Sequence, residues 1–211
     1  MKREDLCRAL SKIAWGYVFL YFNLNLGFGG HQVNVLPDWV YYVQVWGAIL
    51  LLEGVLRDLK LLKTFCIFLG AVSCGSWLGA IFGVELPHAL VLWSLLVTVA
   101  GLYFHFQMLT VLIQGIQSGL FGMGAAGAGL ANRLRACRNI QALLQTATAL
   151  LVFLWDVPQT GSVSVEGLVG ALVVLLALAG IIMALVLVFA LFKLRRCVRE
   201  EELPWTKTTT K

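Results

Sequence analysis

The sequence alternates long apolar runs with short basic segments, and this alternation limits what the chain can fold into. Six apolar runs cover roughly residues 10–28, 38–56, 61–84, 88–113, 140–157 and 167–192. An α-helix rises about 1.5 Å per residue, so about 20 apolar residues cross a hydrocarbon core of about 30 Å. The pattern therefore predicts an all-α bundle of six transmembrane helices, with residues 1–211 forming one polytopic membrane domain.

The basic residues gather around alternate junctions between these runs. All 16 lysines and arginines lie near the start of the first run, between the second and third, between the fourth and fifth, or after the sixth. Cytoplasmic segments of membrane proteins carry such an excess, so we expect cytoplasmic N- and C-termini, a cytoplasmic loop at 114–139 and a cytoplasmic tail at 193–211. Only 13% of the residues are charged, and the net charge of +5 is spread over short segments. The expected partner is therefore the lipid bilayer and not a nucleic acid.

The segment 23–39, NLNLGFGGHQVNVLPDW, connects the first two runs on the predicted outer side. It supplies most candidates for an outward-facing polar vestibule, which are Asn23, Asn25, His31, Asp38 and Gln44. Asn23 and Asn25 would point to opposite sides of a continuous helix, so both line one pocket only if the helix unwinds. The nearby glycines favour unwinding. Pro37 and Asp38 are typical of the start of the next helix.

The same segment resembles small uncharacterised multi-span membrane proteins of Gram-positive bacteria. The shared features are an Asn-x-Asn-x-Gly ending to the first span, a Leu-Pro-Asp-aromatic start to the second, and the later segments LIQGI and LANRLR. Tyr41 and Tyr42 stand where those proteins usually have glycine and tyrosine. The resemblance implies a multi-span topology in a bacterial cytoplasmic membrane, and it implies no activity.

Polar side chains inside the apolar runs are few, and the candidates are Glu53, His105 and Gln107. An ionisable group within a bilayer is by default a functional hypothesis. Arg57 follows Glu53 by four residues and offers it an ion pair on one helix face. We favour this structural interpretation over a proton relay that couples Glu53 with His105.

Small residues recur every four positions in the third run, at Ala71, Gly75, Gly79 and Gly83. Such a stripe lets membrane helices approach closely. It predicts a packing face, used by another helix of this chain or by a homo-oligomer or membrane partner.

The predicted inner loop contains Gly122-x-Gly124-x-x-Gly127, the spacing of a dinucleotide-binding fingerprint. That motif needs a preceding strand and a βαβ unit, for which the chain has no room here. We instead expect a short basic helix on the inner leaflet, with Leu130, Leu134 and Cys137 on its apolar face.

The sequence contains no catalytic motif, so no catalytic residue and no cofactor is assigned. His31, Glu85 and His88 are weak candidates for metal ligands, because they lie in the outer connections without a tight ligand spacing. We predict a multi-pass membrane protein without enzymatic activity, in a partner-binding or scaffold role. The alternative is a small-solute or ion transporter that uses the outer vestibule.

Overall fold

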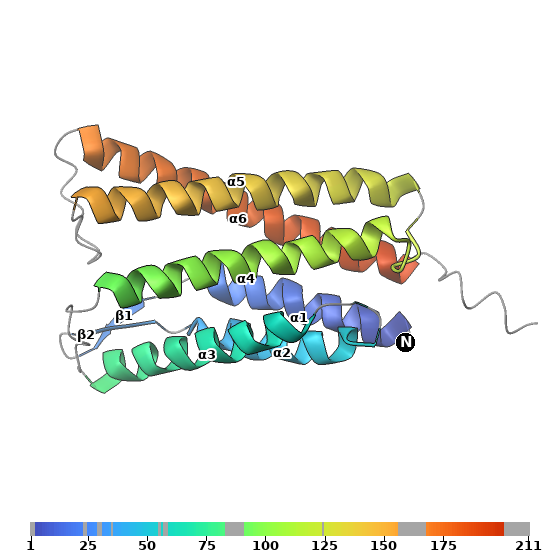
Figure 1. Cartoon of the computed structure of the whole chain (residues 1–211), viewed down its shortest axis with the longest axis horizontal. Helices are drawn as coiled ribbons and strands as arrows, with labels where there is room; N and C mark the ends of the chain where they lie inside the picture. The colour runs from blue at the N-terminus through green and yellow to red at the C-terminus, as the bar shows by residue number, and fades with distance from the viewer. Residues whose placement is uncertain are drawn as a thin grey trace, which may run out of the picture.

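The computed structural model describes residues 3–22, 25–28, 31–34, 36–54, 56, 59–82, 91–123, 125–155 and 168–200. These residues form six helices and a two-stranded hairpin (Figure 1). In chain order the elements are α1 (Arg3–Tyr21), β1 (Asn25–Phe28), β2 (His31–Asn34), α2 (Trp39–Leu52), α3 (Leu59–Phe82), α4 (Val91–Gln117), α5 (Ala125–Trp155) and α6 (Leu168–Glu200).

The helices form a closed ring of antiparallel neighbours. Each helix packs against the next one in the chain, and α6 returns to pack against α1. Because successive helices alternate in direction, the start of α1, the α4–α5 turn and the end of α6 lie at the same end of the bundle (Figure 1). All described lysines and arginines lie toward this end, which we name the basic end.

Helix α1 supplies much of the core. Leu6, Leu10, Ile13 and Tyr17 recur at spacings of three and four residues and are fully buried or nearly so. That spacing places them on one face of the helix. The exposed surface is also strongly apolar, with Phe82 75%, Phe189 70% and Leu175 62% exposed.

Three helices are long and apolar enough to cross a membrane: α3, α4 and α6. Large apolar side chains on the outside of a bundle are the expected surface toward lipid. Helix α2 is apolar as well but has only 14 residues, about 21 Å of helix. The described residues therefore support a helical membrane protein, with fewer clear spans than the six expected.

The first predicted span, 10–28, is shifted in the structure. Helix α1 begins at Arg3, where Glu4 and Asp5 in its first turn favour the positive end of the helix dipole. It ends at Tyr21, and Asn25 lies in β1, paired with Asn34 of β2. The six described helices confirm the all-α class, and the Asn- and Gly-rich segment that follows α1 adds a short antiparallel hairpin that was not predicted.

The predicted inner loop, 114–139, is mostly helical. Helix α4 continues to Gln117, and α5 begins at Ala125 and runs without interruption to Trp155. Gly119 and Gly122 have φ of 72° and 73° and form the turn between them. The expected basic helix is thus the first half of α5 and not a separate helix. Its apolar face is as predicted, since Leu130, Leu134 and Cys137 are buried.

Candidate functional site

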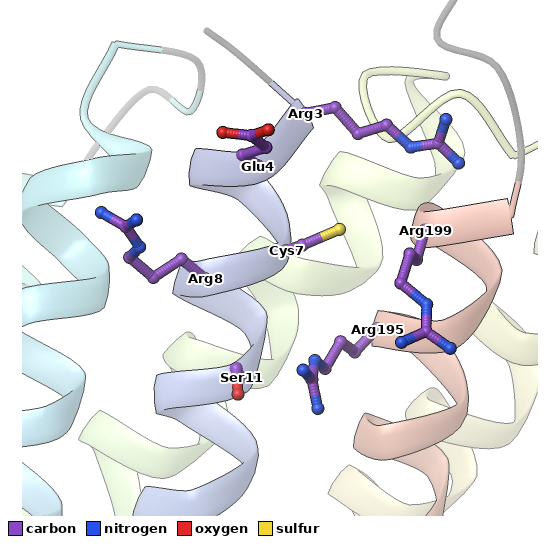
Figure 2. Close-up of a pocket in the computed structure, with 7 residues that line it drawn as sticks. All are labelled: Arg3, Glu4, Cys7, Arg8, Ser11, Arg195 and Arg199. Atoms are coloured by element: carbon purple, nitrogen blue, oxygen red, sulfur yellow. The ribbon is translucent and has the colours of Figure 1, made fainter.

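A pocket of about 400 Å³ opens at the basic end, between the start of α1 and the end of α6. We name it the arginine pocket, and its lining residues are Arg3, Glu4, Cys7, Arg8, Ser11, Arg195 and Arg199. Figure 2 shows these side chains on the two helices, with Cys7 and Arg195 pointing into the space between them and Arg8 pointing to the other side of α1.

Helical spacing explains why these residues gather. Arg3, Cys7 and Ser11 are four residues apart along α1, and Arg195 and Arg199 are four apart along α6. Residues at this spacing share one face of a helix. The packing of α6 against α1 brings the two faces together.

Arg3 links α1 to the end of α6 at the pocket. Its Nε donates a hydrogen bond to the carbonyl oxygen of Val198 at 3.0 Å. The last carbonyl groups of a helix have no partner within it, so this bond satisfies one of them at the end of α6. The Nη2 of Arg3 is buried and has no hydrogen-bond partner among the described residues. A buried charged donor of this kind is costly unless an acceptor meets it.

The pocket is strongly electropositive. Its lining residues include four arginines and one glutamate, a formal charge of +3, of which Arg8 points away from the space between the two helices. Within the described residues, no carboxylate forms an ion pair with any of these arginines. A guanidinium group presents paired N–H donors that match a phosphate or carboxylate. The arrangement is therefore suited to an anion.

Besides the arginine pocket, the described residues contain a cluster of three polar side chains inside the bundle, Tyr17, Tyr41 and His105. The Tyr41 hydroxyl shares a hydrogen bond with Nδ1 of His105 at 3.1 Å, and the Tyr17 hydroxyl lies 3.5 Å from the same nitrogen. A cavity of about 10 Å³ borders His105 between α4 and α5, which is at the lower limit for one water molecule. Gln107, predicted to be an intramembrane polar residue, is half-buried on α4.

Glu53 and His105 are not coupled. Glu53 lies just after α2, is exposed, and forms an ion pair with Lys63 of α3. Arg57, the partner predicted from the sequence, lies outside the described residues. The pair of Glu53 with Arg57 stays a prediction, and the described hydrogen-bond partners of His105 are the two tyrosines.

The hairpin side of the bundle does not bring the vestibule candidates into one site within the described residues. Asn23 and the side chains of Asn25 and His31 lie outside the description. Asp38 directly precedes α2, as predicted, and burial raises its pKa to about 6. Gln44 lies farther along α2, where it borders Gly16 of α1.

Asn34 organises this region, although the sequence analysis did not single it out. Its side chain donates to Asp38 at 3.4 Å and accepts from the backbone N–H of Leu36 at 3.0 Å. The backbone carbonyl oxygen of Asn34 accepts a hydrogen bond from the indole N–H of Trp77 at 2.9 Å, which joins the hairpin to α3. An Asn four residues before the helix-starting Asp is the sequence signal for this turn.

The small-residue stripe of α3 is exposed at two of its three described positions. Ala71 and Gly75 are exposed, and nothing lies within 4 Å of where a Cβ of Gly75 would be. Gly79 is half-buried, and Gly83 lies outside the described residues. The close helix approach occurs one position away, where a Cβ on Gly70 would lie 3.1 Å from Cβ of Tyr42 on α2.

The weak metal candidates cannot be placed together. Glu85, His88 and the side chain of His31 lie outside the described residues. In the part of the chain that is described, no three His, Cys, Asp or Glu residues lie close enough to hold a metal ion.

The arginine pocket was missed by sequence reasoning, which used its basic residues only to orient the helices. Its two halves are separated by almost the whole chain, so no local motif signals their meeting. Comparison with protein-family models, curated proteins and solved structures finds no match to this chain.

Proposed function

We propose that this chain is a multi-pass integral membrane protein that binds an anionic partner at its basic end and has no enzymatic activity. The observation that carries the proposal is the arginine pocket, with its charge of +3 and no carboxylate partner among the described residues. We also propose a bacterial cytoplasmic membrane as its location, a proposal that rests on the resemblance to proteins of Gram-positive bacteria.

The distribution of charge supports six membrane-crossing helices with both termini in the cytoplasm. The described lysines and arginines lie toward one end of a ring of antiparallel helices. Lysine and arginine accumulate on the cytoplasmic side of membrane proteins. The arginine pocket would then open at the cytoplasmic face.

The filled interior supports binding over transport. Tyr17, Tyr41, Phe104 and Met108 are fully buried within the bundle. The pocket beside His105 has only about 10 Å³. A solute path would need a continuous wide cavity, and the described residues instead pack against one another at the level of these side chains.

Thermal unfolding of the purified protein in a neutral detergent tests the proposal, with pyrophosphate as the probe. A ligand that binds the folded state stabilises it by RT ln(1 + L/Kd), where L is the free ligand concentration, so the unfolding midpoint rises with that concentration. We expect pyrophosphate to raise the midpoint of the wild type, and the double variant Arg195→Gln/Arg199→Gln to lose most of that rise.

The matched control is Arg133→Gln/Arg135→Gln, which removes the same charge from exposed positions on α5. It should respond to pyrophosphate as the wild type does. Equal responses from the two double variants would show that the anion acts only through net charge and would refute a binding site in the pocket.

A further inference from the structure

We propose that the arginine pocket holds the phosphate headgroup of an anionic phospholipid from the inner leaflet. This inference rests on the proposed function and names the anion. Phosphate is the shared chemistry of a lipid headgroup and a free phosphate ester, so the choice between them depends on what lies around the phosphate site.

Arg3 is the residue best placed to position the headgroup. Its Nε is already used by the carbonyl oxygen of Val198. The hydrogen bond holds the guanidinium between α1 and α6 and leaves Nη2 buried without a partner among the described residues. Arg195 and Arg199 supply guanidinium donors for a phosphate from the facing helix.

The pocket is longer than a phosphate group. It extends along α1 from Arg3 to Ser11, about 12 Å at 1.5 Å per residue. An ion alone would occupy only part of this length, whereas a headgroup with the start of its glycerol backbone fits it.

An apolar surface continues the same groove toward the middle of the bundle. Trp15 lies four residues beyond Ser11, is 50% exposed, and packs edge-on against Phe192 of α6 at 5.6 Å between ring centroids. Phe189, one turn further along α6, is 70% exposed. Along α1 and α6 the side chains thus change from arginines to exposed aromatic rings, which matches the change from a polar headgroup to apolar chains in a phospholipid.

The height of the pocket matches the headgroup layer. Residues 168–192 of α6 contain no charged residue, and these 25 residues span about 37 Å of helix. They are long enough to cross the hydrocarbon core of about 30 Å. Arg195 and Arg199 follow directly, at the level where basic residues between membrane helices bind anionic headgroups.

Native mass spectrometry of the protein, released from mixed micelles of phosphatidylglycerol and phosphatidylcholine, tests the assignment. We expect preferential retention of phosphatidylglycerol. The variant Arg195→Gln/Arg199→Gln should retain it about thirty-fold less well, since each basic residue beside an anionic headgroup contributes about a fivefold factor. Arg133→Gln/Arg135→Gln should retain it as the wild type does.

Trp15→Gln separates a lipid from a free phosphate. It should weaken retention of phosphatidylglycerol and leave the unfolding shift with pyrophosphate unchanged, because only a lipid reaches the aromatic surface. Trp93→Gln, at another exposed tryptophan, should change neither measurement.

The outcomes of the two experiments are distinct. Equal retention of the two lipids, together with an unfolding shift by pyrophosphate that depends on Arg195 and Arg199, would overturn the lipid assignment and leave the proposed function standing. If neither pyrophosphate nor phosphatidylglycerol depends on these arginines, both proposals fail.

Discussion

Arg3 and Val198 lie 195 positions apart in the chain, and a hydrogen bond of 3.0 Å joins them. Arg3 belongs to the first turn of α1, and Val198 to the last turn of α6. The bond closes the helix ring at the basic end and aligns the two halves of the arginine pocket. The same side chain therefore contributes to the fold and to the proposed binding site.

Replacing Arg3 by alanine should destabilise the protein and weaken anion binding together. The loss of one hydrogen bond with a charged donor is expected to cost about 1.5 to 3 kcal/mol of unfolding free energy. Denaturation in detergent, with and without pyrophosphate, measures both effects. Arg135→Ala removes an exposed arginine from α5 and should change little, so equal losses in the two variants would contradict this role of Arg3.

Gly115 in α4 should not tolerate alanine, because a Cβ there would lie 2.5 Å from Cζ of the buried Phe121. We expect Gly115→Ala to lower the unfolding free energy by about 1 to 3 kcal/mol, the usual cost of overpacking.

Gly101 provides the control in the same helix, since nothing lies within 4 Å of its added Cβ. Gly101→Ala should be neutral or stabilising by up to about 1 kcal/mol, from its higher helix propensity. Equal thermal stability of the two variants would show that Phe121 does not pack against Gly115.

Removing the Tyr41 hydroxyl tests the polar group inside the bundle. Tyr41 is fully buried, and its hydroxyl shares a hydrogen bond with His105. Tyr41→Phe should therefore reduce the unfolding free energy by about 0.5 to 1.5 kcal/mol. The half-exposed Tyr103 gives the comparison, because Tyr103→Phe should have a smaller effect. An unchanged stability of Tyr41→Phe would mean that this hydrogen bond contributes nothing net.

Asp38 should make stability depend on pH. Burial raises its pKa from 3.8 to about 6, so its carboxyl group binds a proton more tightly in the folded state than in the unfolded state. Between pH 3.8 and about 6, Asp38 is ionised in the unfolded state and still protonated in the folded state. A rise in pH across this range therefore favours unfolding. The unfolding free energy contributed by Asp38 is thus highest below about pH 4 and falls as the pH rises to about 6.

Asp38→Asn should remove this part of the pH dependence and should be relatively more stable than the wild type at neutral pH. Thermal unfolding between pH 4 and 7 measures the difference. Glu4→Gln at the exposed Glu4 serves as the control. Parallel pH profiles for the wild type and Asp38→Asn would rule out Asp38 as the source.

The positions of the apolar runs predicted the order of the helices and the apolar face of α5, because both depend on local periodicity. Local patterns were less informative at the helix ends. The glycines of residues 115–129 suggested a loop, yet among those that the structure describes only Gly119 and Gly122 have a positive φ, and α5 continues through Gly127 and Gly129. Sequence also predicted the end of α1 too late, since Asn25 pairs across a hairpin.

The arginine pocket could not be predicted from the sequence, for a different reason. Arg3 and Arg199 meet only because α6 returns to α1, and a contact between the two ends of a chain leaves no spacing to recognise. The α3 stripe shows the reverse case. Its spacing predicted a packing face; an added Cβ at Gly75 meets nothing within 4 Å among the described residues, and Gly70 makes the close approach to α2, so packing of the stripe against another subunit stays a prediction.

The inner-leaflet position of the arginine pocket requires the basic end to face the cytoplasm. Single reporter cysteines test this directly, in a background with Cys7, Cys74 and Cys197 changed to serine. Ser118→Cys is in the turn that follows α4, and Gly30→Cys is in the sequence segment between Phe28 and His31, on the predicted outer side. With a membrane-impermeant maleimide, we expect labelling of Gly30→Cys in intact cells and of Ser118→Cys only after permeabilisation. Labelling of Ser118→Cys in intact cells would contradict the orientation and with it the binding of an inner-leaflet lipid.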